Sequence, residues 1–142
     1  MEGSQSGEEV ATRQVGQTVI IALKLPWPPS TNAYYRVVNN RAILSAHARE
    51  YRQQVQVLFG GNAPLTGRLG IVIYAFPPDK RQRDLDNLLK QPLDALQAAG
   101  IYCNDGQIDQ LMIRRQEARP DHPHLLVYID DGDTGDDPQE GT

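Results

Sequence analysis

The sequence predicts an α+β fold, in which one small domain packs two main helices on a mixed β-sheet. Three observations favour this class. Two runs rich in β-branched and apolar residues, 18–25 and 69–76, are typical of strands. Two other stretches, 46–59 and 85–99, repeat apolar residues at helical spacing. The chain has 142 residues, a length typical of a single domain.

The strand predicted at 18–25 ends at a group of prolines, because proline cannot donate to a sheet ladder. The loop that follows, 30–36, is rich in hydroxyl, amide and tyrosine side chains. It has two interpretations. It is an ordinary connector whose tyrosines pack on the core, or it contacts phosphate through Ser30, Asn32 and Arg36.

The middle of the chain predicts a hairpin, a helix and a strand. Residues 37–44 contain Asn39-Asn40, a pair that suits a tight hairpin turn. Ser45 can cap a helix over 46–59, whose apolar stripe includes Tyr51, Val55 and Leu58. The strand 69–76 again ends at two prolines.

The second helix has a buried stripe that begins at Leu85 and ends before Gly100, which suits the position after a helix. Pro92 interrupts it, because proline removes the amide that would bond to Leu88. We expect either a kink, or a short turn through 87–91 with Pro92 opening the main helix.

Two more strands are predicted near the C-terminal end. Residues 101–103 form a short apolar return, and Asn104-Asp105 follows it at a turn. The runs 110–118 and 124–129 are apolar enough for strands, and the short link between them predicts a hairpin at the edge of the sheet.

The charge is divided unevenly along the chain. Residues 1–17 sum to −2 and residues 130–142 to −6, and both segments have few apolar residues, so we expect both to be disordered. The folded domain is therefore predicted at 18–129. Although the whole chain carries −4, this body carries +4 and is compatible with a polyanionic partner.

Nothing in the sequence predicts a membrane or secretory protein. There is no apolar run near 18 residues, and no basic segment followed by an apolar core at the N-terminus. The single cysteine, Cys103, cannot form an intramolecular disulfide. We therefore expect a cytoplasmic protein.

Three aspartates and a lysine between the second long strand and the C-terminal strands suggest a metal site. Asp84 and Asp86 are two residues apart, so on an extended segment their carboxylates leave the same side. Lys90 follows Asp86 by four, so a helix there would place both on one face. Together with Asp105 they suit a hard cation and an anionic substrate. Taken singly, each also has a structural reading as a cap, an ion pair or a turn residue.

At these residues the sequence resembles a known family. Its motifs are Pro28-Pro29-Ser30-x-Asn32, then Arg83-Asp84-Leu85-Asp86-Asn87-(x)2-Lys90 with Leu93-Asp94-Ala95-Leu96, and finally Asn104-Asp105-x-Gln107-Ile108. In this order they are similar to the RusA family of Holliday-junction resolvases, over about residues 20–129. The family often has two acidic residues where this chain has Asn104-Asp105.

The resemblance implies a Mg²⁺-dependent endodeoxyribonuclease of bacterial or phage origin that cuts four-way junction DNA as a homodimer. Paired symmetric nicks would leave 5′-phosphate ends and serve recombination and repair. Mg²⁺, with Mn²⁺ as a substitute, would be held by Asp84, Asp86 and Asp105, with Lys90 as the fourth catalytic residue. The DNA-binding candidates share a polar or basic side chain near these motifs: Asn32, Arg36, Lys80, Arg81, Arg83 and Asn87.

Two other functions stay open at this stage. A non-catalytic module that binds branched DNA would use the basic body without the carboxylates. A metal-dependent phosphohydrolase acting on a small substrate would use the carboxylates without the arginines of the body. Cleavage tests with junction DNA and with small phosphate esters separate the three.

Overall fold

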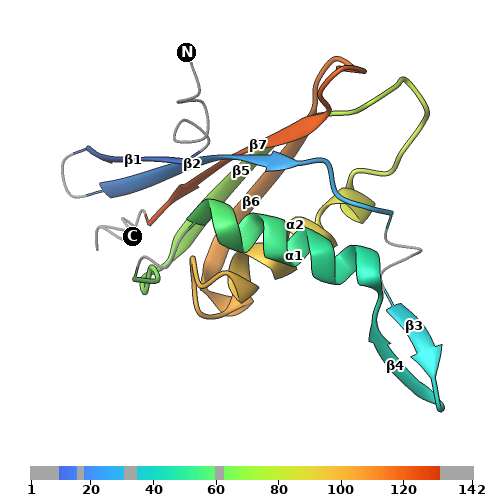
Figure 1. The fold of residues 1–142 in the computed structure, drawn as a ribbon. Coiled ribbons are helices and arrows are strands. Elements are labelled where there is room, and N and C mark those ends of the chain that lie inside the picture. The colour runs from blue at the N-terminus through green and yellow to red at the C-terminus, as the bar shows by residue number, and fades with distance from the viewer. Residues whose placement is uncertain (1–9, 16–17, 31–34, 60–62, 132–142) are drawn as a thin grey trace.

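The computed structural model describes residues 10–15, 18–30, 35–59 and 63–131. It has five strands in one sheet, a separate two-stranded hairpin and two α-helices (Figure 1). The strands are β1 (Val10–Val15), β2 (Thr18–Pro26), β3 (Tyr35–Val38), β4 (Arg41–Leu44), β5 (Leu69–Phe76), β6 (Ile108–Arg115) and β7 (His124–Asp130). The helical elements are α1 (Ala46–Phe59), α2 (Lys90–Ala98) and the 3-10 turns η3 (Asp86–Leu88) and η4 (Asp105–Gln107).

The large sheet is mixed, in the order β1-β2-β7-β5-β6. All neighbours are antiparallel except β5 and β6, which run parallel. Parallel neighbours need a long crossover connection. Here the crossover connection contains η3, α2 and η4. Every acidic residue of the predicted site therefore lies on this single connection between β5 and β6.

One face of the sheet is covered by α1 and α2 (Figure 1). Alternate residues of the three central strands point into this layer and are buried, for example Ile21, Ile73 and Val127. They meet Tyr51 and Val55 of α1 together with apolar residues of α2. The β5 burial pattern alternates strictly, as expected for a strand with one face in the core.

Several predictions about local structure are confirmed. The first helix spans the predicted 46–59, and the Ser45 hydroxyl accepts from the Ala48 amide at 3.2 Å. Gly100 has φ +85° and follows α2 as predicted. The predicted short turn before the main helix is present, but it is η3 (Asp86–Leu88), and α2 begins at Lys90 with Pro92 as its third residue instead of its first. Asn39 and Asn40 both have positive φ and close the β3–β4 hairpin.

The predicted hairpin between the last two strands is wrong. β7 lies between β2 and β5, and β6 pairs with the other side of β5. The reason is burial: β7 is mostly buried, whereas the side chains of β6 are mostly exposed and suit an edge. The link passes around the end of β5, with Gln116 N bonded to Ala75 O at 2.8 Å and Arg119 N to Pro77 O at 2.7 Å.

The predicted disorder of residues 1–17 is wrong for Val10–Val15, which form β1 and pair with β2. At the other end, Asp130 belongs to β7, so the predicted boundary falls inside a strand. Residues 132–142 lie outside the described part of the chain, and the expectation for them stays a prediction. Within the described ranges, no helix is long and apolar enough to cross a membrane.

Candidate active site

Asp84 and Asp86 lie where the chain turns from the end of β5 into α2. The prediction that Asp84 and Asp86 lie on one side of an extended segment is wrong, because Leu85 between them has helical φ and ψ of −64° and −36°. The backbone instead forms a tight turn in which Asn87 N bonds to Asp84 O at 3.2 Å and Leu89 N to Asp86 O at 3.2 Å. Both carboxylates are exposed at the start of this turn.

Lys90 is the first residue of α2, and η3 separates it from a continuous helix with Asp86. Its ammonium forms an ion pair with Asp94, 3.3 Å away and one helical turn further on. Asp94 also lies 3.9 Å from the guanidinium of Arg52 on α1. Asp94 thus positions Lys90, a role that the i, i+4 spacing could have indicated.

Asp105 is held by the capping box of η4. The Asn104 side-chain oxygen accepts from the Gly106 amide at 2.6 Å, and the Gln107 side chain accepts from the Asn104 amide at 3.0 Å. This arrangement satisfies free amides at the start of a helical turn. Asn104 therefore uses its oxygen in local structure, and the exposed carboxylate of this turn is that of Asp105.

Two residues that the prediction left out of the site fix this turn to the body. The Gln107 amide donates to Leu65 O and to Gly67 O, each at 3.0 Å, while its oxygen also accepts from Cys103 N at 2.8 Å. Arg68 donates to Gly106 O at 2.8 Å and pairs with Asp109, whose pKa it lowers. Gln107 is part of the motif recognised in the sequence, but only the fold shows that its side chain fixes the position of the η4 turn.

Tyr102 connects the two halves of the site. Its buried hydroxyl donates to Leu93 O of α2 at 2.8 Å. Burial raises the pKa of Tyr102, and the nearby negative charges of Asp105 and Asp94 raise it further. The hydrogen bond of Tyr102 to Leu93 thus ties the segment just before η4 to α2.

The three predicted metal ligands are not gathered into a preformed cage. Within the described ranges, no three acidic, histidine or cysteine side chains are close enough to hold a metal ion together. Yet Asp84, Asp86 and Asp105 are exposed, and their side chains form no ion pair or hydrogen bond with another described residue. Mg²⁺ is commonly held by one or two carboxylates, several waters and substrate phosphates. The donor set therefore fits Mg²⁺.

The basic loop before Asp84 is ordered around Asp79. The Asp79 carboxylate lies 2.8 Å from the Arg83 guanidinium and accepts from the Arg81 amide at 3.0 Å, and these bonds lower its pKa. Arg83 also lies over the Trp27 ring, 5.7 Å from its centroid, with 17% of its side chain exposed. Arg83 is thus engaged within the protein, whereas Lys80 and Arg81 are exposed.

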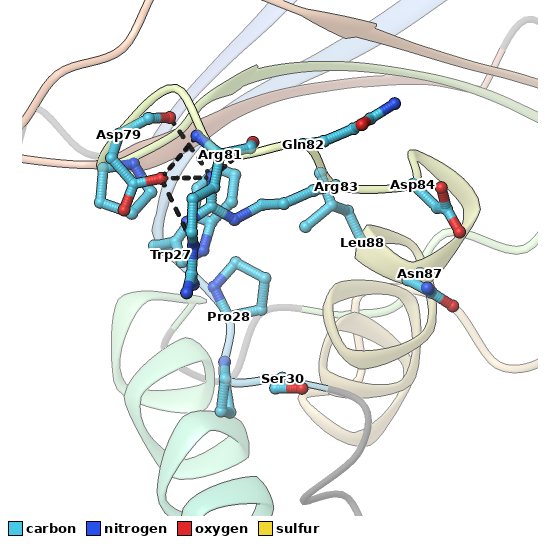
Figure 2. A pocket seen from close by; sticks show the side chains of 12 residues that line it. Trp27, Pro28, Ser30, Asp79, Arg81, Gln82, Arg83, Asp84, Asn87 and Leu88 are labelled. Carbon is cyan, nitrogen blue, oxygen red and sulfur yellow. Dashed lines mark hydrogen bonds and ion pairs between the residues drawn. The ribbon is translucent and has the colours of Figure 1, made fainter.

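The remaining DNA-binding candidates are spread over two regions. Asn87 is exposed on η3 next to Asp84, and both line a pocket together with Trp27 (Figure 2). Arg36 is exposed on the β3–β4 hairpin, which projects from the body (Figure 1). Asn32 lies outside the described residues. The segment just before it is held to α2, since the buried Gln91 amide donates to Pro29 O at 2.8 Å and to Ser30 O at 3.2 Å.

Comparison with known proteins gives one consistent result. Residues 26–130 match the family model described as "Endodeoxyribonuclease RusA". A crossover junction endodeoxyribonuclease of Enterobacteria phage 82 is 42% identical over 89 residues, covering 61% of this chain and 74% of the relative. The protein of that name from Escherichia coli strain K12 is 43% identical over 91 residues, covering 61% and 75%. That of Enterobacteria phage HK97 is 38% identical over 94 residues, covering 64% and 78%.

Proposed function

Because the chain belongs to the RusA family of endodeoxyribonucleases, we propose that it resolves Holliday junctions by hydrolysing phosphodiester bonds in two strands of the junction. The observation that carries this proposal is the placement of Asp84, Asp86, Lys90 and Asp105 on the single crossover between β5 and β6. Three carboxylates without an ion-pair partner among the described residues and a lysine, all on one connection of the chain, suit the handling of a phosphate group. We expect this activity to serve DNA recombination and repair, and relatives named as crossover junction endodeoxyribonucleases in bacteria and phages support that role.

The chemistry assigns a role to each of these residues. Asp84, Asp86 and Asp105 would hold Mg²⁺, or Mn²⁺ in its place, together with water and phosphate oxygens. The metal would supply Lewis acidity and a water of lowered pKa. Lys90, positioned by Asp94, stabilises the negative charge that grows on the phosphate. Hydrolysis forms a bond between a water oxygen and phosphorus and breaks the bond between phosphorus and the 3′ oxygen. The water gives up a proton and the 3′ oxygen takes one up, so the products are a 3′-hydroxyl and a 5′-phosphate.

DNA contacts outside the reacting group come from exposed basic side chains. Lys80 and Arg81 lie on the loop that leads to Asp84, and Arg36 lies on the projecting hairpin. Such side chains bind phosphates and position a nucleic acid without reading its sequence. Asn87, beside Asp84, contacts the phosphate or orients a carboxylate.

The test is cleavage of a labelled mobile four-way junction by the full chain with Mg²⁺, beside matched duplex and single-stranded DNA. We expect paired nicks in the junction alone, and none when a chelator removes the metal. Binding without cleavage under Mg²⁺ and Mn²⁺ would leave a branched-DNA-binding module. Turnover of small phosphate esters without junction binding would indicate the small-substrate hydrolase instead.

We also propose that the chain acts as a homodimer, since two equivalent strands of a junction call for two equivalent sites. The face of the sheet opposite α1 and α2 is the surface that fits a second copy, because no described element covers it. Its middle row is apolar, with Val72 paired to both Tyr128 and Met112, which are 40% and 46% exposed.

The charged rows on each side of this apolar row are complementary about a two-fold axis. On one side of the apolar row, Lys24 of β2 and Arg114 of β6 lie in the same cross-strand row, which runs through one residue of β7 and one of β5. On the other side, Asp130 lies next to Gly70. A two-fold axis through the apolar row places the basic row of one copy against Asp130 of the other.

Met112→Asp is therefore expected to weaken the dimer by about a hundredfold or more, because it sets two like charges against each other within the apolar row. Sedimentation over a range of protein concentrations measures this. Leu111→Asp is the matched control: Leu111 is 41% exposed on the same strand but registers with Ile71, on the helix-facing side. A wild-type chain that stays monomeric, or equal effects of both variants, would contradict this interface.

A further inference from the structure

A pocket of about 580 Å³ opens directly beside Asp84. Three separate segments form it: the prolines and Trp27 after β2, the basic loop after β5, and η3. Figure 2 shows Asp84 and Asn87 at one end, with Trp27, Asp79 and Arg81 at the other. Its volume lies within the roughly 300–1,000 Å³ of pockets that bury small organic molecules. It is larger than the contact with a single phosphate requires.

At the end away from Asp84, the pocket wall combines an aromatic and apolar surface with the charged side chains of Asp79 and Arg81. Trp27 presents its indole there, beside the ring of Pro28. The wall is ordered in advance, because Arg83 lies over the indole and is itself held by Asp79 at 2.8 Å. A flat aromatic group held in place is the usual platform for stacking a nucleobase.

Polar side chains stand at the rim. Gln82 and Arg81 are exposed and line the pocket, and the Gln82 amide bonds to no other described residue. An amide can donate and accept at the edge of a base, and a guanidinium can donate twice. The pocket thus combines a stacking surface with groups able to distinguish bases.

We propose that this pocket binds one unstacked nucleobase of the junction strand, next to the phosphate that Asp84 helps to cleave. This inference rests on the proposed function and adds the element that reads base identity. A paired duplex keeps its bases inside the stack, and enzymes that handle a single base have to extrude it. Extrusion costs least where pairing is already interrupted, as at the crossover of a four-way junction. The pocket would therefore contribute both to the preference for branched DNA and to the choice of cleavage position.

Trp27 is the only tryptophan of the chain, so tryptophan fluorescence reports on this one residue, which lines the proposed pocket and a neighbouring pocket of about 250 Å³. The experiment titrates the full-length Asp86→Asn chain with a dye-labelled junction and follows two signals. Anisotropy of the dye measures junction binding, and Trp27 emission measures stacking. We expect a saturable fall in Trp27 emission, at the same midpoint as binding. The fall is expected to disappear with a junction made abasic at the crossover.

Binding with unchanged Trp27 emission would overturn the pocket while leaving the proposed function in place. If anisotropy shows no junction binding, the proposed function is contradicted. A titration with single-stranded dinucleotides then tests nucleotide binding by the pocket independently. A saturable fall in emission with dinucleotides supports a nucleotide pocket, and no fall overturns it.

A pair of variants tests specificity without altering the carboxylates. In an otherwise wild-type chain, Gln82→Ala is expected to relax the base preference at the cleavage position by roughly tenfold on junctions randomised at the crossover. Gln97→Ala on α2, also an exposed glutamine but outside this pocket, should leave the preference unchanged. Equal preferences in wild type and Gln82→Ala would remove Gln82 from base reading.

Discussion

Replacing Asp86 with asparagine is expected to lower the rate of junction cleavage by roughly a thousandfold, without weakening junction binding. The substitution keeps the size of the side chain but removes the charge that a hard cation needs. Asp86 is exposed at the start of η3 and bonds to no other described side chain, so the fold loses little. Single-turnover cleavage and gel-shift binding of the same junction, both in Mg²⁺, measure the two effects.

Asp121→Asn is the matched control, because Asp121 is equally exposed but lies in the loop between β6 and β7. It should cleave like the wild type. A similar loss in both variants would mean that the effect comes from overall charge. Full cleavage by Asp86→Asn would exclude Asp86 from the metal site and leave Asp84 and Asp105 to be tested in the same way.

The second large effect is expected from Gln107→Ala. This side chain makes four hydrogen bonds, which join the η4 turn to itself and to the segment before β5. At about 1 kcal/mol net for each bond, the free energy of unfolding should fall by about 2–4 kcal/mol. Cleavage should fall as well, because Asp105 loses the support of its turn. Denaturant unfolding and cleavage rates measured on the same protein check both.

Gln97→Ala provides the comparison, since Gln97 is exposed on α2. It is expected to change stability by no more than about 0.5 kcal/mol. Gln107→Glu separates the two sets of bonds, because a carboxylate can still accept from Cys103 and Asn104 but cannot donate to Leu65 or Gly67. If Gln107→Ala were as stable as Gln97→Ala, the four hydrogen bonds of Gln107 would contribute nothing measurable to the free energy of unfolding.

Local elements were predictable where one residue type decides the backbone. Ser45 before α1, Gly100 after α2 and the Asn39-Asn40 turn were each read correctly from the chain. The order of strands was not, because it depends on which strand pairs with a neighbour along both of its edges. Periodicity shows that residues 124–129 form a strand, but only the packed sheet shows that this strand lies between β2 and β5.

The candidate site divides in the same way. The motifs identified the residues, but spacing alone gave the wrong local geometry for Asp84 and Asp86, since Leu85 turns the backbone. The supports came from distant segments that no motif contains, such as Arg68 and Arg52. The pocket beside Trp27 could not be foreseen, because its three walls meet only in the folded chain.

The edge position of β6 affects the order in which activity and fold are lost when the protein is destabilised. β6 pairs with β5 alone, and η4, which carries Asp105, leads directly into the start of β6. Partial opening of a domain usually begins at such edges, at a lower cost than complete unfolding. Release of β6 would remove one of the supports of the Asp105 turn while β1, β2, β7 and β5 stay paired. As temperature or denaturant concentration rises, cleavage activity should therefore be lost before the rest of the domain unfolds.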